Sequence, residues 1–145
     1  MKSNILLVGT VSNVAKRFPH DFQNVYTTLS SMFEVETFIV ESDSTDQTVK
    51  MLQIFSENCT NFAFKSYGFL SGSIPDRIDR IRHCRNKYVE FIRNFSQIRE
   101  WKYIVIVDLD GMNGKLDNDG LKSCFIRNDW DICLANQSGG YYDIL

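Results

Sequence analysis

The sequence predicts an α/β protein built on a doubly wound, mainly parallel sheet with helices on both of its faces. Three observations indicate this class: short apolar runs alternate with amphipathic segments, polar or glycine residues close the apolar runs, and no repeat or linker interrupts the order. At 145 residues the chain has the size of one domain, so we expect a single domain over residues 1–145.

The first strand and the first helix are predicted from apolar spacing. Ile5–Val8 is a short apolar run ended by Gly9, which is typical of a buried parallel strand. Behind Pro19, apolar residues from Phe22 to Phe33 recur at steps of three and four, the spacing of an amphipathic helix. One strand and one helix are therefore expected before the second strand begins.

A second pair of elements follows, with a polar cluster between them. Thr37–Val40 predicts a strand, and the polar segment Glu41–Asp46 begins where that strand ends. Ser44 or Thr45 is expected to cap the next helix, because hydroxyl side chains satisfy the free amides of a first turn. Asn61–Lys65 predicts a weaker third strand. The inner face of the second helix is expected to carry Val49, Leu52 and Phe55.

The second half of the chain contains the longest expected helix and the strongest expected strand. Gly68–Ser73 is expected to form a loop, and Pro75 to occupy the first position of a long helix. Tyr103–Val107 is uninterrupted and β-branched, so we expect a strand near the centre of the sheet. The residues expected on the inner face of the long helix are Ile78, Ile81, Cys84, Tyr88, Phe91, Ile92 and Phe95.

Two shorter elements are expected near the C-terminal end. Asp117–Ile126 predicts a short helix, and Asp131–Ala135 a last strand before Gly139 and Gly140. Strands that alternate with helices form a parallel sheet, in which ligands bind beyond the carboxyl ends of the strands.

Charge and hydropathy exclude several classes of function. A formal charge of −2 produces no field that would gather nucleic acid, so no nucleic-acid partner is expected. Ile5–Val8 is too short for the core of a signal peptide, and no run approaches the ~20 apolar residues of a membrane span. We therefore expect a cytoplasmic protein without a transmembrane segment.

The four cysteines carry no metal or redox signature in the sequence. Cys59, Cys84, Cys124 and Cys133 include no CxxC pair and have no nearby His at ligand spacing. We therefore expect neither a zinc site nor a redox pair, and all four are expected to be reduced residues of the core.

Polar clusters follow three of the expected strands, at Thr10–Asn13, Glu41–Asp46 and Asp108-Leu109-Asp110. A doubly wound sheet would bring these clusters to one edge. Asp108 and Asp110 leave a buried strand, where side chains at i and i+2 point to one side. Mg²⁺ and Mn²⁺ commonly take one or two carboxylates and complete their shell with water and substrate phosphate. The pair therefore predicts a Mn²⁺ or Mg²⁺ site for a diphosphate, although such a DxD also arises by chance in exposed loops.

The long helix begins with a basic stretch of four arginines. Arg77 falls on the expected inner face and Arg80 at its edge. A guanidinium on an inner face indicates an anionic partner such as a phosphate or a carboxylate. Arg82 and Arg85 lie further round the helix, where a solvated face with ion pairs to neighbours such as Asp79 is an equally good interpretation.

Taken in order, these motifs resemble those of metal-dependent glycosyltransferases of the GT-A type. The resemblance rests on Thr10–Asn13, Val40–Thr48, the helix from Arg77 to Asn86, and Asp108–Asp110. It is nearest to the fungal capsule-associated mannosyltransferases and their relatives, which also carry a segment like Tyr141-Tyr142-Asp143. The match spans almost the whole chain.

The resemblance implies a donor site for a UDP- or GDP-linked sugar, held through a divalent metal, with a glycan or another hydroxyl compound as acceptor. Related enzymes often have a second acidic residue where Ser42 stands, so Asp43 is a candidate to replace that contact. The resemblance places Thr10, Ser12 and Glu41 near the nucleoside, Arg77 and Arg85 toward the base or diphosphate, and Asp108 and Asp110 on the ribose and the metal.

No catalytic base follows from the resemblance. Related enzymes usually continue past a position like Leu145 into an acceptor-binding half, which supplies that base or its equivalent. Asp143 is the only late acid at a comparable motif position, and we favour a loop-capping or edge role for it. Inverting and retaining chemistry are both open.

Two other functions fit parts of the sequence. Val107–Gly111 resembles the nucleophile motif of haloacid-dehalogenase-like phosphatases, in which Asp108 would attack phosphorus. That motif usually occupies a first strand, has Thr where Met112 stands, and needs a downstream lysine and acidic pair. A module that binds a nucleotide sugar without turning it over is the second alternative, because no acceptor site is visible.

Overall fold

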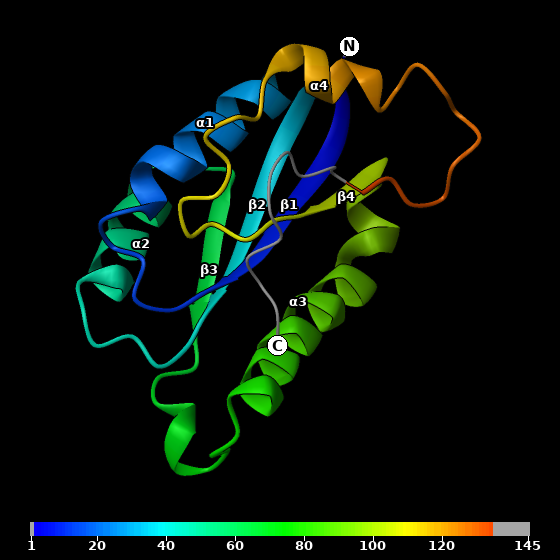
Figure 1. The fold of residues 1–145 in the computed structure, drawn as a ribbon. Coiled ribbons are helices and arrows are strands. Elements are labelled where there is room, and N and C mark those ends of the chain that lie inside the picture. The colour runs from blue at the N-terminus through cyan, green and yellow to red at the C-terminus, as the bar shows by residue number, and fades with distance from the viewer. Residues whose placement is uncertain (1, 135–145) are drawn as a thin grey trace.

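The computed structural model describes residues 2–134, which form a four-stranded sheet with helices on both faces (Figure 1). The predicted α/β class and its doubly wound sheet are confirmed. In chain order the elements are β1 (Ser3–Val11), α1 (Phe18–Ser30), β2 (Phe33–Glu41), α2 (Thr48–Asn58), β3 (Phe62–Ser66), the 3₁₀ turn η1 (Leu70–Gly72), α3 (Arg77–Arg99), β4 (Tyr103–Ile106) and α4 (Asn118–Ser123).

All four strands are parallel, in the order β3-β2-β1-β4. The first strand is therefore an inner strand, and β4 lies at the edge of the described sheet. The prediction that Tyr103–Val107 is central was wrong. Only one face of this apolar run is covered. Tyr103 and Val105 pack into the core, whereas Ile104 and Ile106 are 37% and 62% exposed.

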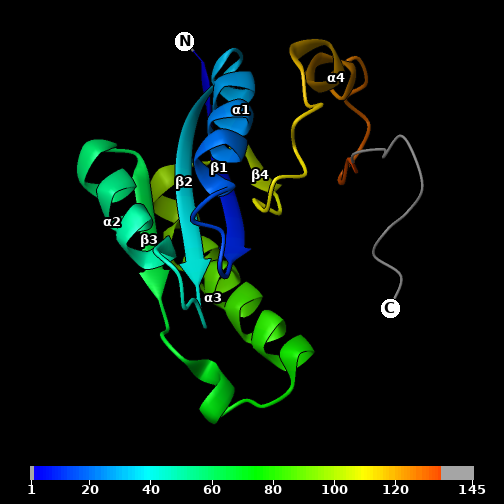
Figure 2. The ribbon, with the colours of Figure 1, turned by 60° about the vertical axis from the view of Figure 1, so that its left-hand side comes forward.

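Two separate cores hold the helices on the sheet. On one face, Ile5 and Leu7 of β1 pack against α1, whose Phe18 and Phe22 rings stack at 5.2 Å. On the other face, Leu6 and Val8 pack under α3. Because successive side chains of a strand point to opposite faces, the buried run of β1 serves both cores. Figures 1 and 2 show α3 on the opposite side of the strands from α1 and α2.

The helix starts differ from the prediction. Neither Ser44 nor Thr45 caps α2: the amide of Thr48 donates instead to Oδ1 of Asp46 (2.9 Å). Pro75 precedes α3 rather than opening it, and Asp76 is the residue that caps its first turn.

The inner face of α3 is narrower than its pattern predicted. Cys84 and Tyr88 are its buried residues, whereas Ile78 is 59% exposed, against our expectation. The first turn of α3 projects past the carboxyl ends of the strands, so no sheet lies beneath Ile78 (Figure 1).

The C-terminal part of the described chain contains one short helix, α4, within the predicted range 117–126. Residues 131–134 do not form the predicted strand, because no neighbouring strand pairs with them among residues 2–134. Ala135, the two late glycines and the Tyr141–Asp143 segment lie outside the described residues. Within residues 2–134, no helix combines the length and the apolar character that a bilayer crossing requires.

Candidate functional site

The strand order reverses between β1 and β4, and the carboxyl ends of these two strands form what we call the β1–β4 switch point. The chain moves from β1 outward to β2 and β3 and then returns to the other side of β1 to form β4. Doubly wound sheets bind ligands at such a reversal of strand order. Thr10 and Ser12 lie at the end of β1, and Asp108 and Asp110 follow β4. The structure therefore brings four of the sequence-predicted site residues to one place.

The two strands are in close contact at Gly9. The amide of Val107 donates to the carbonyl of Val8 (3.0 Å) and so extends the β1–β4 pairing by one residue. A Cβ atom built on Gly9 would lie only 2.6 Å from the carbonyl oxygen of Val107. Glycine at position 9 therefore sets where the chain leaves β4, and with it the position of the aspartate pair.

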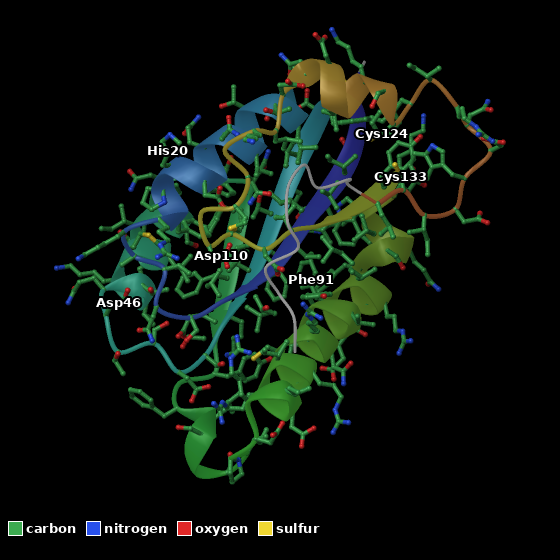
Figure 3. All side chains as sticks on the ribbon, viewed as in Figure 1. His20, Asp46, Phe91, Asp110, Cys124 and Cys133 are labelled. Carbon is green, nitrogen blue, oxygen red and sulfur yellow. The ribbon has the colours of Figure 1, made fainter. Side chains whose placement is uncertain are left out.

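The aspartate pair is held by the residue between its members. Leu109 is 1% exposed and belongs to the core under α1, while Asp108 is exposed and Asp110 is half-buried. Figure 3 shows Asp110 on the segment that crosses the sheet after β4. Oδ1 of Asp110 is buried and has no hydrogen-bond partner among the described residues. A buried carboxylate oxygen without a partner is costly unless a ligand completes its shell.

The charge balance at Asp110 is unfavourable in the protein alone. Burial, and then the neighbouring charge of Asp108, raise the pKa of Asp110, and Asp21 adds to the rise while Arg17 opposes it. The shift therefore reflects desolvation first and the neighbouring negative charges second. A divalent cation at this point would stabilise the charged form of Asp110.

Two residues of the first helix region support the segment after Asp110. The carboxylate of Asp21, 2% exposed, accepts hydrogen bonds from the amides of Gly111 (3.1 Å) and Asn113 (2.9 Å). Arg17 donates to the carbonyl of Asp110 (3.4 Å). The sequence analysis missed both residues. The available signal was an acid, Asp21, on the buried side of an amphipathic helix, where an unpaired charge is costly.

On the α3 side, the charges of Arg85 and Asp108 both act on Tyr88. Burial raises the pKa of Tyr88, the charge of Arg85 lowers it, and the charge of Asp108 raises it. Arg85 is exposed. Its expected role toward the base or diphosphate stays a prediction.

Arg77 does not take the inward position that its spacing predicted. It is exposed, and it makes no ion pair within residues 2–134. Arg80 turns inward instead: its Nε lies 3.5 Å from Asp43, and its Nη1 donates to the carbonyl of Ile74 (2.9 Å). The reason is that α3 begins beyond the sheet, so the inward direction at its first turn faces the η1 loop.

Asp43 organises the loops beyond β2 and β3. Its backbone has a φ of 60°, its amide donates to Gly68 (2.8 Å), and its carboxylate accepts from the amide of Ser71 (2.8 Å). Burial acts to raise the pKa of Asp43, but the hydrogen bonds from Ser71 and Ser42 and the charge of Arg80 lower it overall. The carboxylate is thus already satisfied by the protein.

Asn13 joins the loops beyond β1 and β2. Its side-chain oxygen accepts from the amides of Thr45 (2.8 Å) and Asp46 (3.3 Å), while Thr48 accepts from the amide of Val14 (2.9 Å). These bonds fix the two loops against each other and leave Ser12 exposed at the end of β1. Such preorganised loops are typical of binding sites built on rigid strands.

Glu41 is buried by the same loops. It is 1% exposed, and its carboxylate accepts from the amide of Ser44 (3.0 Å) and from the hydroxyl of Ser66. Both oxygens are engaged within the protein, so a nucleoside contact by Glu41 would require these bonds to open.

We expect Glu41→Ala to lower the free energy of unfolding by about 2 to 3 kcal/mol, because a charged acceptor and two hydrogen bonds are lost. Denaturant unfolding measures this change. Glu34→Ala is the matched control, since Glu34 lies exposed on the same strand and should change stability little. If the Glu41 variant had normal stability but bound nucleotide weakly, the result would contradict the structural role and would support the nucleoside contact instead.

The donor set fits a metal shared with a substrate. Throughout residues 2–134, no group of three or more His, Cys, Asp or Glu side chains is placed to enclose a metal. Two carboxylates are nevertheless the usual protein share at a Mn²⁺ or Mg²⁺ site that is completed by phosphate and water. The orphaned oxygen of Asp110 and the exposed carboxylate of Asp108 match that share.

The sequence matches no model of a known protein family and no curated protein. The functional argument therefore rests on the site itself.

Proposed function

We propose that this protein binds a nucleotide-diphosphate sugar at the β1–β4 switch point and serves as the donor-binding part of a metal-dependent glycosyltransferase. One observation carries the proposal: a buried carboxylate oxygen of Asp110, beside Asp108, has no partner within residues 2–134, at the point where the strand order reverses. The ordered motifs that resemble GT-A enzymes support it.

In this proposal the residues around the switch point have separate roles. Asp108 and Asp110 would hold Mn²⁺ or Mg²⁺, which supplies positive charge to the departing diphosphate. Thr10 and Ser12 would offer hydroxyl donors to the nucleotide, and Arg85 would add a further positive charge from α3. The acceptor, a glycan or another hydroxyl compound, and the catalytic base are not assigned to described residues.

Thermal unfolding with UDP, GDP, CDP and dTDP, each with and without Mn²⁺, tests the donor site. Saturating ligand adds about 2.7 kcal/mol at a hundredfold excess over Kd, which raises the midpoint of a domain of this size by roughly 2 to 8 °C. We expect a rise that requires both one nucleotide and the metal. No rise with any of the eight combinations would refute the donor site.

A transfer assay separates an enzyme from a binding module. Sugar transfer from a radiolabelled donor, or its hydrolysis, would support the enzyme, whereas binding without turnover would indicate the module. The phosphatase alternative is disfavoured because Asp108 follows the fourth strand of the chain rather than the first. Aluminium fluoride with Mg²⁺ in place of a nucleotide would stabilise the protein only under that alternative.

A further inference from the structure

Cys124 and Cys133 lie together beyond α4. The expectation that all four cysteines are core residues is wrong for Cys59 and Cys133, which are exposed. Both line one hollow of about 430 Å³. Figure 3 places them at the same corner of the molecule. Of the four cysteines only Cys84 is buried, while Cys59 and Cys133 are exposed and Cys124 is partly exposed. The sequence spacing gave no sign of the pair, because the chain turns back on itself between the two residues.

The turn that brings the two thiols together is held by Trp130. Its indole nitrogen donates to the carbonyls of Cys124 (2.8 Å) and Arg127 (3.0 Å). Its ring stacks on Tyr103 of β4 at 5.5 Å. The side chain of Arg127 pairs with Asp129 inside the turn (2.6 Å). The reversal is therefore anchored to the sheet, and the two thiols are neighbours before any bond forms.

The two thiols differ in access. Burial, and then the adjacent thiol of Cys133, raise the pKa of Cys124, so this residue stays protonated more readily than an ordinary cysteine. Cys133 is exposed and also lines the hollow. An external reagent therefore meets Cys133 first, and Cys124 is placed to react second.

We propose that Cys124 and Cys133 are a site of reversible oxidation that forms an intramolecular disulfide by exchange with a low-molecular-weight disulfide such as oxidised glutathione. The thiolate of Cys133 attacks one sulfur of the reagent and releases one glutathione thiolate. Cys124 then loses its proton and attacks the mixed disulfide at the Cys133 sulfur, releasing the second glutathione. The protein loses two protons and two electrons, and the reagent is reduced to two thiols.

Peptide mapping of the full chain tests this proposal. The protein is incubated with oxidised glutathione, its remaining thiols are alkylated, and it is digested with trypsin without reduction. Cleavage after Lys122 and Arg127 separates the two cysteines. We expect one species that joins the Ser123–Arg127 peptide to the peptide starting at Asn128, about 2 Da lighter than their sum.

Thiol variants make the result specific. Cys59→Ser should form the same linked species, because Cys59 lies elsewhere on the surface. In Cys124→Ser the reaction should stop at glutathione bound to Cys133, since no second thiol can displace it. Stable glutathione adducts on Cys59 and Cys133 alike in the wild-type protein, with no linked species, would overturn the proposal. A disulfide between two chains in place of the internal one would also overturn it.

Discussion

Asp110→Asn is expected to remove the metal-dependent part of nucleotide binding. The substitution keeps the size of the side chain but removes the charge that would ligate Mn²⁺ or Mg²⁺, and loss of a charged contact costs about 1.5 to 3 kcal/mol, or roughly 10- to 150-fold in Kd. Titration of the preferred nucleotide with and without Mn²⁺ measures the effect. Any metal-independent affinity should survive.

The same variant should be more stable than the wild-type protein without ligand. The pKa of Asp110 is raised in the folded state, so the folded protein binds that proton more tightly than the unfolded chain. Stability is therefore lost as pH rises from the unfolded pKa, about 4, through the folded value. Asparagine does not ionise, so the stability gained by Asp110→Asn should be present at pH 7 and shrink toward pH 3.

Asp131→Asn is the matched control, because Asp131 is exposed and follows α4 rather than the carboxyl end of a strand. It should change neither the metal dependence nor the pH profile. Unchanged metal-dependent binding in Asp110→Asn would show that the metal assignment is wrong. Weaker binding with lower stability would point instead to a general loss of folding.

Gly9→Ala is expected to cost about 3 kcal/mol of unfolding free energy, at the upper end of the range for overpacked sites. The new methyl would lie 2.6 Å from the carbonyl oxygen of Val107, and a backbone atom cannot move aside as a flexible side chain can. The segment that carries the aspartate pair must shift, so metal-dependent binding should weaken as well. Denaturant unfolding and nucleotide titration measure the two effects.

Gly114→Ala provides the comparison. Its added methyl would meet no heavy atom within 4 Å, so stability should change by less than about 0.5 kcal/mol. If both alanine variants were equally stable, the chain after β4 would have to be free to move, and it could not hold Asp108 and Asp110 in a fixed geometry.

Local patterns predicted the elements well where one helix or strand is buried along its length. The apolar run of β1 and the spacing of α1 each reflect burial against a continuous neighbour, so periodicity was sufficient. The same reasoning failed for Ile78 and for residues 131–134. There, burial depends on whether another element lies opposite, which spacing within one segment does not report.

The candidate site was also predictable from the sequence only in part. The chain order placed Thr10, Ser12 and Asp108 after strands, and parallel strands end at one edge, so their proximity was predictable. The hydrogen bonds of Asp21 to the segment after Asp110 were not predictable, and neither was the inward position of Arg80 in place of Arg77. Both depend on side chains that meet from distant parts of the chain.

The sequence by itself determined the class of sheet, the alternation of its elements and the residues at its carboxyl edge, because these follow from periodicity and chain order. Tertiary structure alone decided that β4 lies at the edge of the described sheet, that Asp110 keeps an oxygen without a partner among residues 2–134, and that Cys124 and Cys133 line the same hollow. The physical reason is that these properties depend on packing between segments far apart in the sequence, or on how the chain reverses between them.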